Sequence, residues 1–182
     1  MKRTEFLNSI TANIQDKNTI KHMLAAEAIM KALAKKLGEN EEEWGLTGLI
    51  HDIDLELVGG DLNTHGKLGA DIARELGASE EMAHAILSHN EIHGVPREAK
   101  LDKALFCVDP LAGLIIASAL VRPDKLNGLN TKSVMNHFRQ PRFAAGASRE
   151  QIASCSELEL ELEEFIALGI KAMQGIASEL DL

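Results

Sequence analysis

Residues 44–54 read WGLTGLIHDID, and this stretch decides the prediction of the fold. An apolar run leads into the adjacent polar pair His51-Asp52, and the small residues Gly45 and Gly48 would let a second helix pack closely against the first. Adjacent residues on a helix point about 100° apart, so both members of the pair can face one site only where the helix ends. The stretch therefore predicts a closely packed helix that ends at a polar site.

The pair belongs to a series of imidazoles and carboxylates in segments that we expect to be helical. Its members are His22, His51, Asp52, His65, His89 and Asp109. Nitrogen and oxygen ligands of this kind suit iron, manganese, zinc, nickel, cobalt or magnesium, whereas a closed structural zinc site usually contains thiolates. Because the carboxylate of Asp52 has two oxygens, it could bridge two ions. We therefore expect one or two divalent metal ions in a helical bundle.

Capping residues and apolar spacing predict helices along almost the whole chain. No stretch alternates apolar and polar residues long enough to predict a sheet. The predicted helices span about residues 5–14, 19–37, 41–52, 65–76, 80–89, 99–121, 131–138 and 149–179, with Asn40, Thr64, Ser79 and Ser148 as N-caps. We expect one all-α domain of residues 1–182, with a metal-binding core at about 18–122 and a helical extension at 123–182.

Two details of this pattern concern the site. Pro110 follows Asp109 inside an apolar segment, so we expect a kink or a restart of the helix there, with Asp109 near a cap. His65 and His89 stand at opposite ends of a predicted helical hairpin. Antiparallel packing of the two helices would bring both imidazoles to the same side of the molecule.

Composition narrows the class of protein. The net charge of −9 argues against a nucleic-acid polymer or an anionic membrane as partner. Cys107 and Cys155 fit two buried apolar side chains in a reducing cytosol better than they fit a disulfide. The apolar residues 111–121 are too few to cross a bilayer, which takes about 20, and they predict a core helix instead. We expect a soluble, cytoplasmic protein and leave a homodimer open.

Three further histidines compete with the series. His93 could share a helix face with His89, but Gly94 and the proline after it favour a loop. We interpret His84 as structural, because it lies off the face of His89, and His137 as peripheral.

The order of His22, His51-Asp52 and Asp109 on helices resembles the four-ligand signature of the HD-domain metal-dependent phosphohydrolase superfamily, over about residues 18–122. The chain as a whole, including ALVRP at 119–123, is most similar to a small HDIG-related group of predicted hydrolases. This resemblance implies an all-α HD-type bundle and a metal-dependent hydrolase.

Two more motifs resemble the binuclear branches of that superfamily, such as HD-GYP phosphodiesterases and HD-type symmetrical dinucleoside tetraphosphate hydrolases. They are His65 in HGKLGA and His89 in ILSHN. The resemblance implies a first metal ion on one set of side chains and a second ion on another set that shares Asp52. The first set is His22, His51, Asp52 and Asp109, and the second is Asp52, His65 and His89.

The chain departs from these families just after the pair. Asp54 stands where the HDIG form has glycine, and no Gly-Tyr-Pro motif follows, so we do not expect hydrolysis of cyclic dinucleotides. Asp54 could be a base behind the ligands, and Glu56 a solvated loop acid. Lys67, two residues beyond His65, is the best candidate to hold a substrate phosphate. The predicted catalytic residues are therefore Asp52, Asp54 and Lys67.

Three functions are compatible with this pattern. The first is a phosphohydrolase in which a metal-bound hydroxide attacks a small nucleotide-like phosphoester, with two metal ions. The second is an HD-type di-iron oxygenase, which uses much the same ligands. The third is a non-catalytic nucleotide-binding sensor module. All six members of the ligand series are present in the sequence, which favours an enzyme.

Overall fold

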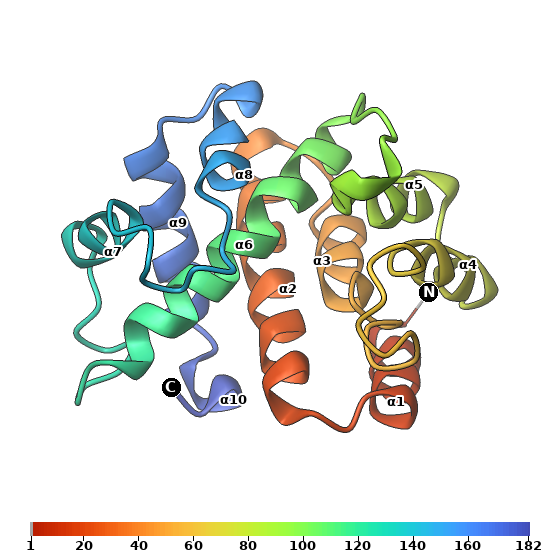
Figure 1. The fold of residues 1–182 in the computed structure, drawn as a ribbon, viewed down its shortest axis with the longest axis horizontal. Coiled ribbons are helices and arrows are strands. Elements are labelled where there is room, and N and C mark those ends of the chain that lie inside the picture. Colours follow the sequence, from red (N-terminus) through yellow and green to blue (C-terminus); the bar gives the residue numbers. More distant parts are fainter. Residues whose placement is uncertain (1) are drawn as a thin grey trace.

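The computed structural model describes residues 2–182, which form helices joined by turns, with no strand among them (Figure 1). The prediction of an all-α fold is confirmed. The helices are α1 (Arg3–Asn13), α2 (Lys17–Leu37), α3 (Glu41–Ile50), α4 (Lys67–Glu75), α5 (Glu80–His89), α6 (Lys100–Leu120), α7 (Thr131–Phe138), α8 (Arg149–Ala153), α9 (Leu162–Gln174) and α10 (Ala177–Leu180). Two 3₁₀ turns, η1 (Glu91–His93) and η2 (Ser154–Leu158), complete the set.

Helix α6 forms the centre of the molecule. In Figure 1 it crosses the view diagonally, with α3, α4 and α5 to one side and α7, α8 and α9 to the other. It packs against α2, α5, α7, α8 and α9. By length and composition α6 could span a membrane, but 67% of its most apolar stretch is buried inside the protein. It is therefore a core helix, as its sequence predicts.

Helices α2 and α3 pack closely because two glycines face α2. A Cβ atom on Gly48 would lie 2.9 Å from the backbone carbonyl of Ala26, and one on Gly45 would meet the side chain of Lys31. The contact at Gly48 is with backbone and is shorter than real Cβ contacts, so this position requires glycine, whereas at Gly45 the flexible side chain of Lys31 could move aside. The predicted role of these small residues is confirmed.

Most predicted caps are confirmed, and Thr64 is the exception. The side chains of Asn40, Ser79 and Ser148 each accept a hydrogen bond from a backbone amide in the first turn of the following helix. The hydroxyl of Thr64 instead donates to Asp61 at 2.8 Å. This contact belongs to a turn that delays the helix, so α4 begins only at Lys67.

The prediction of a helix restart at Pro110, with Asp109 near a cap, is wrong. Helix α6 runs through Pro110 without a break, and Asp109 lies in its interior rather than near a cap. Proline withholds only one backbone donor, and Pro110 is buried in the core together with Leu105 and Leu111. Packing in the core therefore outweighs the local cost of the proline.

The prediction of one helix over residues 149–179 is also wrong. The segment is divided into α8, η2, α9 and α10. Glu159 ends η2 with a left-handed backbone, at a φ of 60°. A second break follows α9 at Gly175. The apolar side chains still face inward, since Phe165 and Ile166 are fully buried, so the periodicity is that of shorter helices.

Candidate metal centre

Five segments bring the six predicted ligands together. His22 comes from α2, the pair from the end of α3, and Asp109 from the middle of α6. His65 precedes α4, and His89 is the last residue of α5. His51 is the C-cap of α3, and Asp52 lies in the turn that follows. The pair thus stands at a helix end, where both side chains can face one site, as the sequence predicts.

The first group of ligand atoms lies between α2, α3 and α6. His22 Nε2 is 3.3 Å from His51 Nε2 and 3.0 Å from Asp109 Oδ1. His51 Nε2 is 3.6 Å from the same oxygen of Asp109. All three donor atoms lie within 4.8 Å of one another, a spacing that could hold a metal ion.

The second group lies on the other side of Asp52. His65 Nε2 is 3.1 Å from His89 Nε2, so the helical hairpin brings the two rings together as predicted. Asp52 Oδ1 is 3.4 Å from His65 Nε2 and 3.7 Å from His89 Nε2. Its other oxygen, Oδ2, faces the first group, at 3.4 Å from His51 Nε2 and 3.7 Å from His22 Nε2. Each oxygen of Asp52 therefore faces a different group.

Three of the four imidazoles are held so that Nε2 points into the cluster. His51 Nδ1 donates to the carbonyl of Gly48 at 2.8 Å, and His89 Nδ1 donates to the carbonyl of Ile86 at 2.5 Å. Because a carbonyl can only accept, each of these rings carries a proton on Nδ1 and leaves Nε2 free to bind a cation. Such partners behind a ligand fix its tautomer and its orientation.

The third such partner is Asp54. Its carboxylate is fully buried and accepts a hydrogen bond from His65 Nδ1 at 2.8 Å. It also accepts from the backbone amides of Gly66 and Gly69, at 2.8 Å each. These contacts lower the pKa of Asp54, although burial alone would raise it. Both oxygens of Asp54 are therefore already occupied by hydrogen bonds from within the protein.

The electrostatics of the cluster favour positive charge at its centre. Burial alone would lower the pKa of His51, but the carboxylates of Asp52 and Asp109 outweigh it and raise that pKa to about 9. For Asp109 burial acts in the opposite direction and would raise the pKa, yet hydrogen bonds and charges from His22 and His51 hold this pKa well below its ordinary value. Two ionised carboxylates among four imidazoles form a donor set that suits divalent cations of the first transition row. The cluster therefore fits a metal site.

The remaining histidines lie outside the cluster. His84 Nδ1 is 3.0 Å from the buried carboxylate of Asp102. His93 Nε2 donates to the backbone carbonyl of His65 at 2.7 Å, so this ring supports the segment rather than facing the ligands. His137 stacks on Phe143, with 4.0 Å between ring centroids.

The other predicted side chains near the pair have different environments. Glu56 accepts hydrogen bonds from the backbone amides of Gln15 and Asp16, at 2.7–3.1 Å, and so joins this turn to the segment between α1 and α2. It is not a purely solvated acid. Lys67 is exposed at the first residue of α4, with its charge near Asp61. Its catalytic role stays a prediction.

Sequence reasoning missed Asn90. Its side-chain amide donates to the carbonyl of Leu62 at 2.7 Å and to that of His65 at 3.0 Å, and its oxygen accepts from the amide of Ile92 at 3.3 Å. One side chain thus joins the loop before α4 to the turn after α5. The only signal in the sequence was its position directly after His89.

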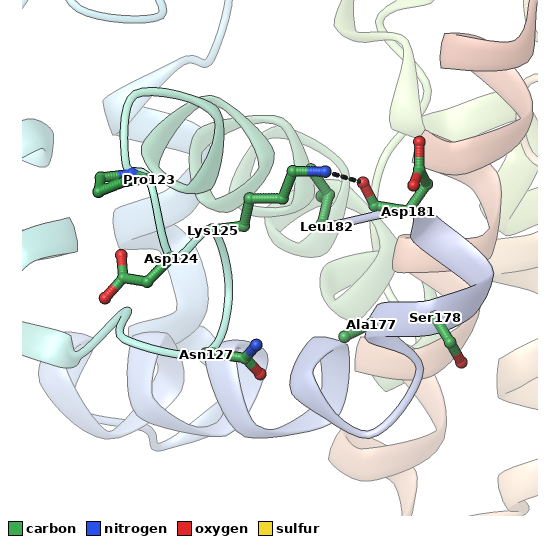
Figure 2. A pocket seen from close by; sticks show the side chains of 8 residues that line it. All are labelled: Pro123, Asp124, Lys125, Asn127, Ala177, Ser178, Asp181 and Leu182. Carbon is green, nitrogen blue, oxygen red and sulfur yellow. Dashed lines mark hydrogen bonds between the residues drawn. The ribbon is translucent and has the colours of Figure 1, made fainter.

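A hollow of about 210 Å³ opens onto the cluster. The ligands that line it are His65, His89 and Asp109. Another hollow, of about 280 Å³, lies between the loop after α6 and the C-terminal segment. Lys125 Nζ donates there to the backbone carbonyl of Asp181 at 2.7 Å, and Figure 2 shows this contact among the lining side chains. None of the six cluster residues lines that second hollow.

Comparison with known proteins agrees with the geometry. Residues 19–112 match the family model described as HD domain. Similar curated proteins include ribonuclease Y of Oleidesulfovibrio alaskensis, 30% identical over 53% of this chain and 18% of the relative. Ribonuclease Y of Pelobacter propionicus is 34% identical over 49% of this chain and 16% of the relative. Ribonuclease Y of Syntrophobacter fumaroxidans is 34% identical over 53% of this chain and 18% of the relative.

The matched stretch makes up less than a fifth of the length of these relatives. No solved structure gave a significant match. The HD-domain model covers more than half of the chain and includes all six cluster residues. The chain therefore belongs to the HD-domain family.

Proposed function

We propose that this protein is a metal-dependent phosphohydrolase that uses two divalent ions to hydrolyse a nucleotide or a related small phosphoester. The observation that carries the proposal is the position of Asp52, whose two oxygens face two separate groups of imidazoles. A carboxylate placed in this way is suited to bridge two ions. Membership in the HD-domain family supports the same reaction class.

The ligands divide between two ions in this proposal. The first ion would be held by His22, His51, Asp52 and Asp109, and the second by Asp52, His65 and His89. Bound divalent ions would supply Lewis acidity, which polarises phosphoryl oxygens and makes water acidic enough to attack near neutral pH. The ring partners at Gly48, Ile86 and Asp54 keep each Nε2 aimed inward, so little reorganisation is needed when an ion binds.

Asp54 acts through His65 in this account rather than on the substrate. Its oxygens already accept from one ring and two backbone amides, which leaves it poorly placed to take a proton from water. Lys67 remains the candidate cation for the substrate phosphate, because it lies two residues after His65 and is exposed. Its ammonium would attract a phosphate against the net charge of −9.

The test is an assay of purified protein loaded with Mn²⁺ under anaerobic conditions, against a panel of mononucleotides, dinucleotides and dinucleoside polyphosphates. Release of phosphate or a nucleotide is the expected result. An oxygenase would give no product without oxygen, and a sensor module would bind a nucleotide without turnover. Either outcome would contradict the proposal.

A second substrate class follows from the relatives. Proteins named ribonuclease Y match about half of the chain, and their name denotes a nuclease that acts on RNA. A short single-stranded RNA belongs in the same assay. Cleavage of that RNA in preference to every small phosphoester would replace the nucleotide by an RNA phosphodiester as the substrate.

A further inference from the structure

We propose that Leu62 and Ile92 form an apolar subsite beside the metal cluster, and that this subsite takes the base of a nucleotide-like substrate. The inference rests on the proposed function and deepens it, because it assigns residues to the part of the substrate that does not react. The observation behind it is the hollow that opens onto the cluster.

Leu62 and Ile92 line this hollow together with three of the ligands. Leu62 is 49% exposed and Ile92 is 53% exposed, and both belong to the small group of large apolar side chains that are exposed in residues 2–182. Single exposed apolar residues need no explanation, but two at the mouth of one polar site lie where a ligand would cover them. Their position beside His65 and His89 places them within reach of a group attached to a bound phosphate.

The two apolar side chains are held in a fixed relation. The side chain of Asn90 bonds the backbone of Leu62 through its amide and the backbone of Ile92 through its oxygen. The same amide bonds the backbone of the ligand His65. Asn90 therefore fixes the backbone of both the subsite and a ligand of the second group. Because these segments are already ordered, substrate binding would cost less conformational entropy than ordering a flexible loop.

The charges around the hollow favour a neutral group. No lysine or arginine occurs among the described residues that line it, and Glu91 adds a carboxylate. A polyphosphate chain placed against Leu62 and Ile92 would find no lysine or arginine there and would face that carboxylate. An uncharged ring would instead bury apolar surface against Leu62 and Ile92.

The polar side chain in this hollow favours a nucleobase over an alkyl chain. Gln151 lines the same hollow from α8, and its side-chain amide makes no hydrogen bond to another residue in the described part of the chain. A free amide has both donors and an acceptor, which match the edge of a nucleobase and gain nothing from a hydrocarbon. Binding sites of small molecules commonly combine an apolar lining with a few such groups.

The test compares adenosine monophosphate with ribose phosphate, which differ by the base alone. Binding of each to Mn²⁺-loaded protein is measured by titration calorimetry, for the wild type, for the double variant Leu62→Ser with Ile92→Ser, and for Leu57→Ser. Leu57 is a matched control, since it is 50% exposed but does not line the hollow.

We expect the wild type and Leu57→Ser to bind adenosine monophosphate at least about tenfold more tightly than ribose phosphate. The double variant should reduce this ratio to within about threefold while the affinity for ribose phosphate stays the same. Equal affinities in the wild type would overturn the subsite and leave the hydrolase proposal standing. Tighter binding of decyl phosphate than of adenosine monophosphate would also overturn it. Failure of loaded protein to bind or hydrolyse any phosphate compound would instead contradict the proposed function.

Discussion

The metal cluster and the C-terminal residues 123–182 both depend on polar networks, but the networks differ in what they connect. In the cluster, charged side chains from five segments face one another, and their backbone partners only fix the ring orientation. In the C-terminal part, one side chain, Arg149, binds backbone carbonyls of an irregular turn. The cluster thus gathers ionisable side chains at one place, whereas the network at Arg149 connects parts of the backbone to one another.

The network at Arg149 replaces regular secondary structure between α7 and α8. Its guanidinium donates to six backbone carbonyls, at 2.5–3.2 Å. These belong to His137, Phe138, Gln140, Phe143, Ala144 and Ala147. Buried or half-buried carbonyls need a partner, and here one cation supplies several. Removing Arg149 should therefore affect stability, and removing a cluster carboxylate should affect chemistry.

The largest expected effect comes from Asp52→Ala. Loss of the bridge should lower kcat/KM by at least about a thousandfold, which is about 4 kcal/mol of transition-state stabilisation. The helical content should stay the same, because the apolar core holds the bundle together. Steady-state kinetics and circular dichroism measure both quantities, and Asp71→Ala, an exposed carboxylate on α4, is the control. Full turnover in Asp52→Ala would show that the reaction does not depend on the bridge.

Arg149→Ala should destabilise the fold and leave the metal site intact. Loss of hydrogen bonds from a charged donor should lower the free energy of unfolding by about 2–3 kcal/mol. Urea denaturation measures this loss, and titration with Co²⁺ should give the wild-type affinity. Arg142→Ala is the matched control, because Arg142 is exposed in the same turn. An unchanged free energy of unfolding in Arg149→Ala would mean that water replaces the guanidinium at no cost.

Asp54→Asn should weaken the second metal site alone. Every partner of Asp54 is a donor, so the amide group of an asparagine would oppose at least one of them. We expect a loss of about 10–100-fold in the affinity of the weaker ion and a changed visible spectrum of bound Co²⁺. Glu56→Gln is the control, since Glu56 also accepts from backbone amides but does not contact a ligand. If both variants bound two ions as the wild type does, Asp54 would not position His65.

The smallest expected effect comes from Gly48→Ala, which links packing to the site. The new Cβ would lie 2.9 Å from the carbonyl of Ala26. Overpacking costs about 1–3 kcal/mol, and the better helix propensity of alanine returns up to about 1 kcal/mol, so we expect a net loss of about 1 kcal/mol. Because His51 donates to the carbonyl of Gly48, the shift should also weaken metal binding. A more stable variant with unchanged metal affinity would contradict this coupling.

The sequence predicted the parts of the molecule that depend on local signals. The caps at Asn40, Ser79 and Ser148 are short-range hydrogen bonds, and each is present. The convergence of His65 and His89 follows from antiparallel packing of neighbouring helices. The pattern and spacing of residues were therefore sufficient to predict the fold class and the grouping of the ligand side chains.

The rest depended on contacts that no local pattern marks. Asn90 and Arg149 donate hydrogen bonds to backbone carbonyls. Every residue type has a backbone carbonyl, so the sequence does not indicate which carbonyls these side chains bind. The break at Glu159 needs a left-handed backbone without a glycine to signal it. Helix α6 continues through Pro110 because of its burial, which only the assembled core reveals.

Anomalous diffraction from crystals soaked in Mn²⁺ would show how many ions the cluster binds and where. We expect two peaks, one bounded by His22, His51 and Asp109 and the other by His65 and His89, with Asp52 between them. A single peak outside the cluster, or no peak at saturating Mn²⁺, would contradict this expectation.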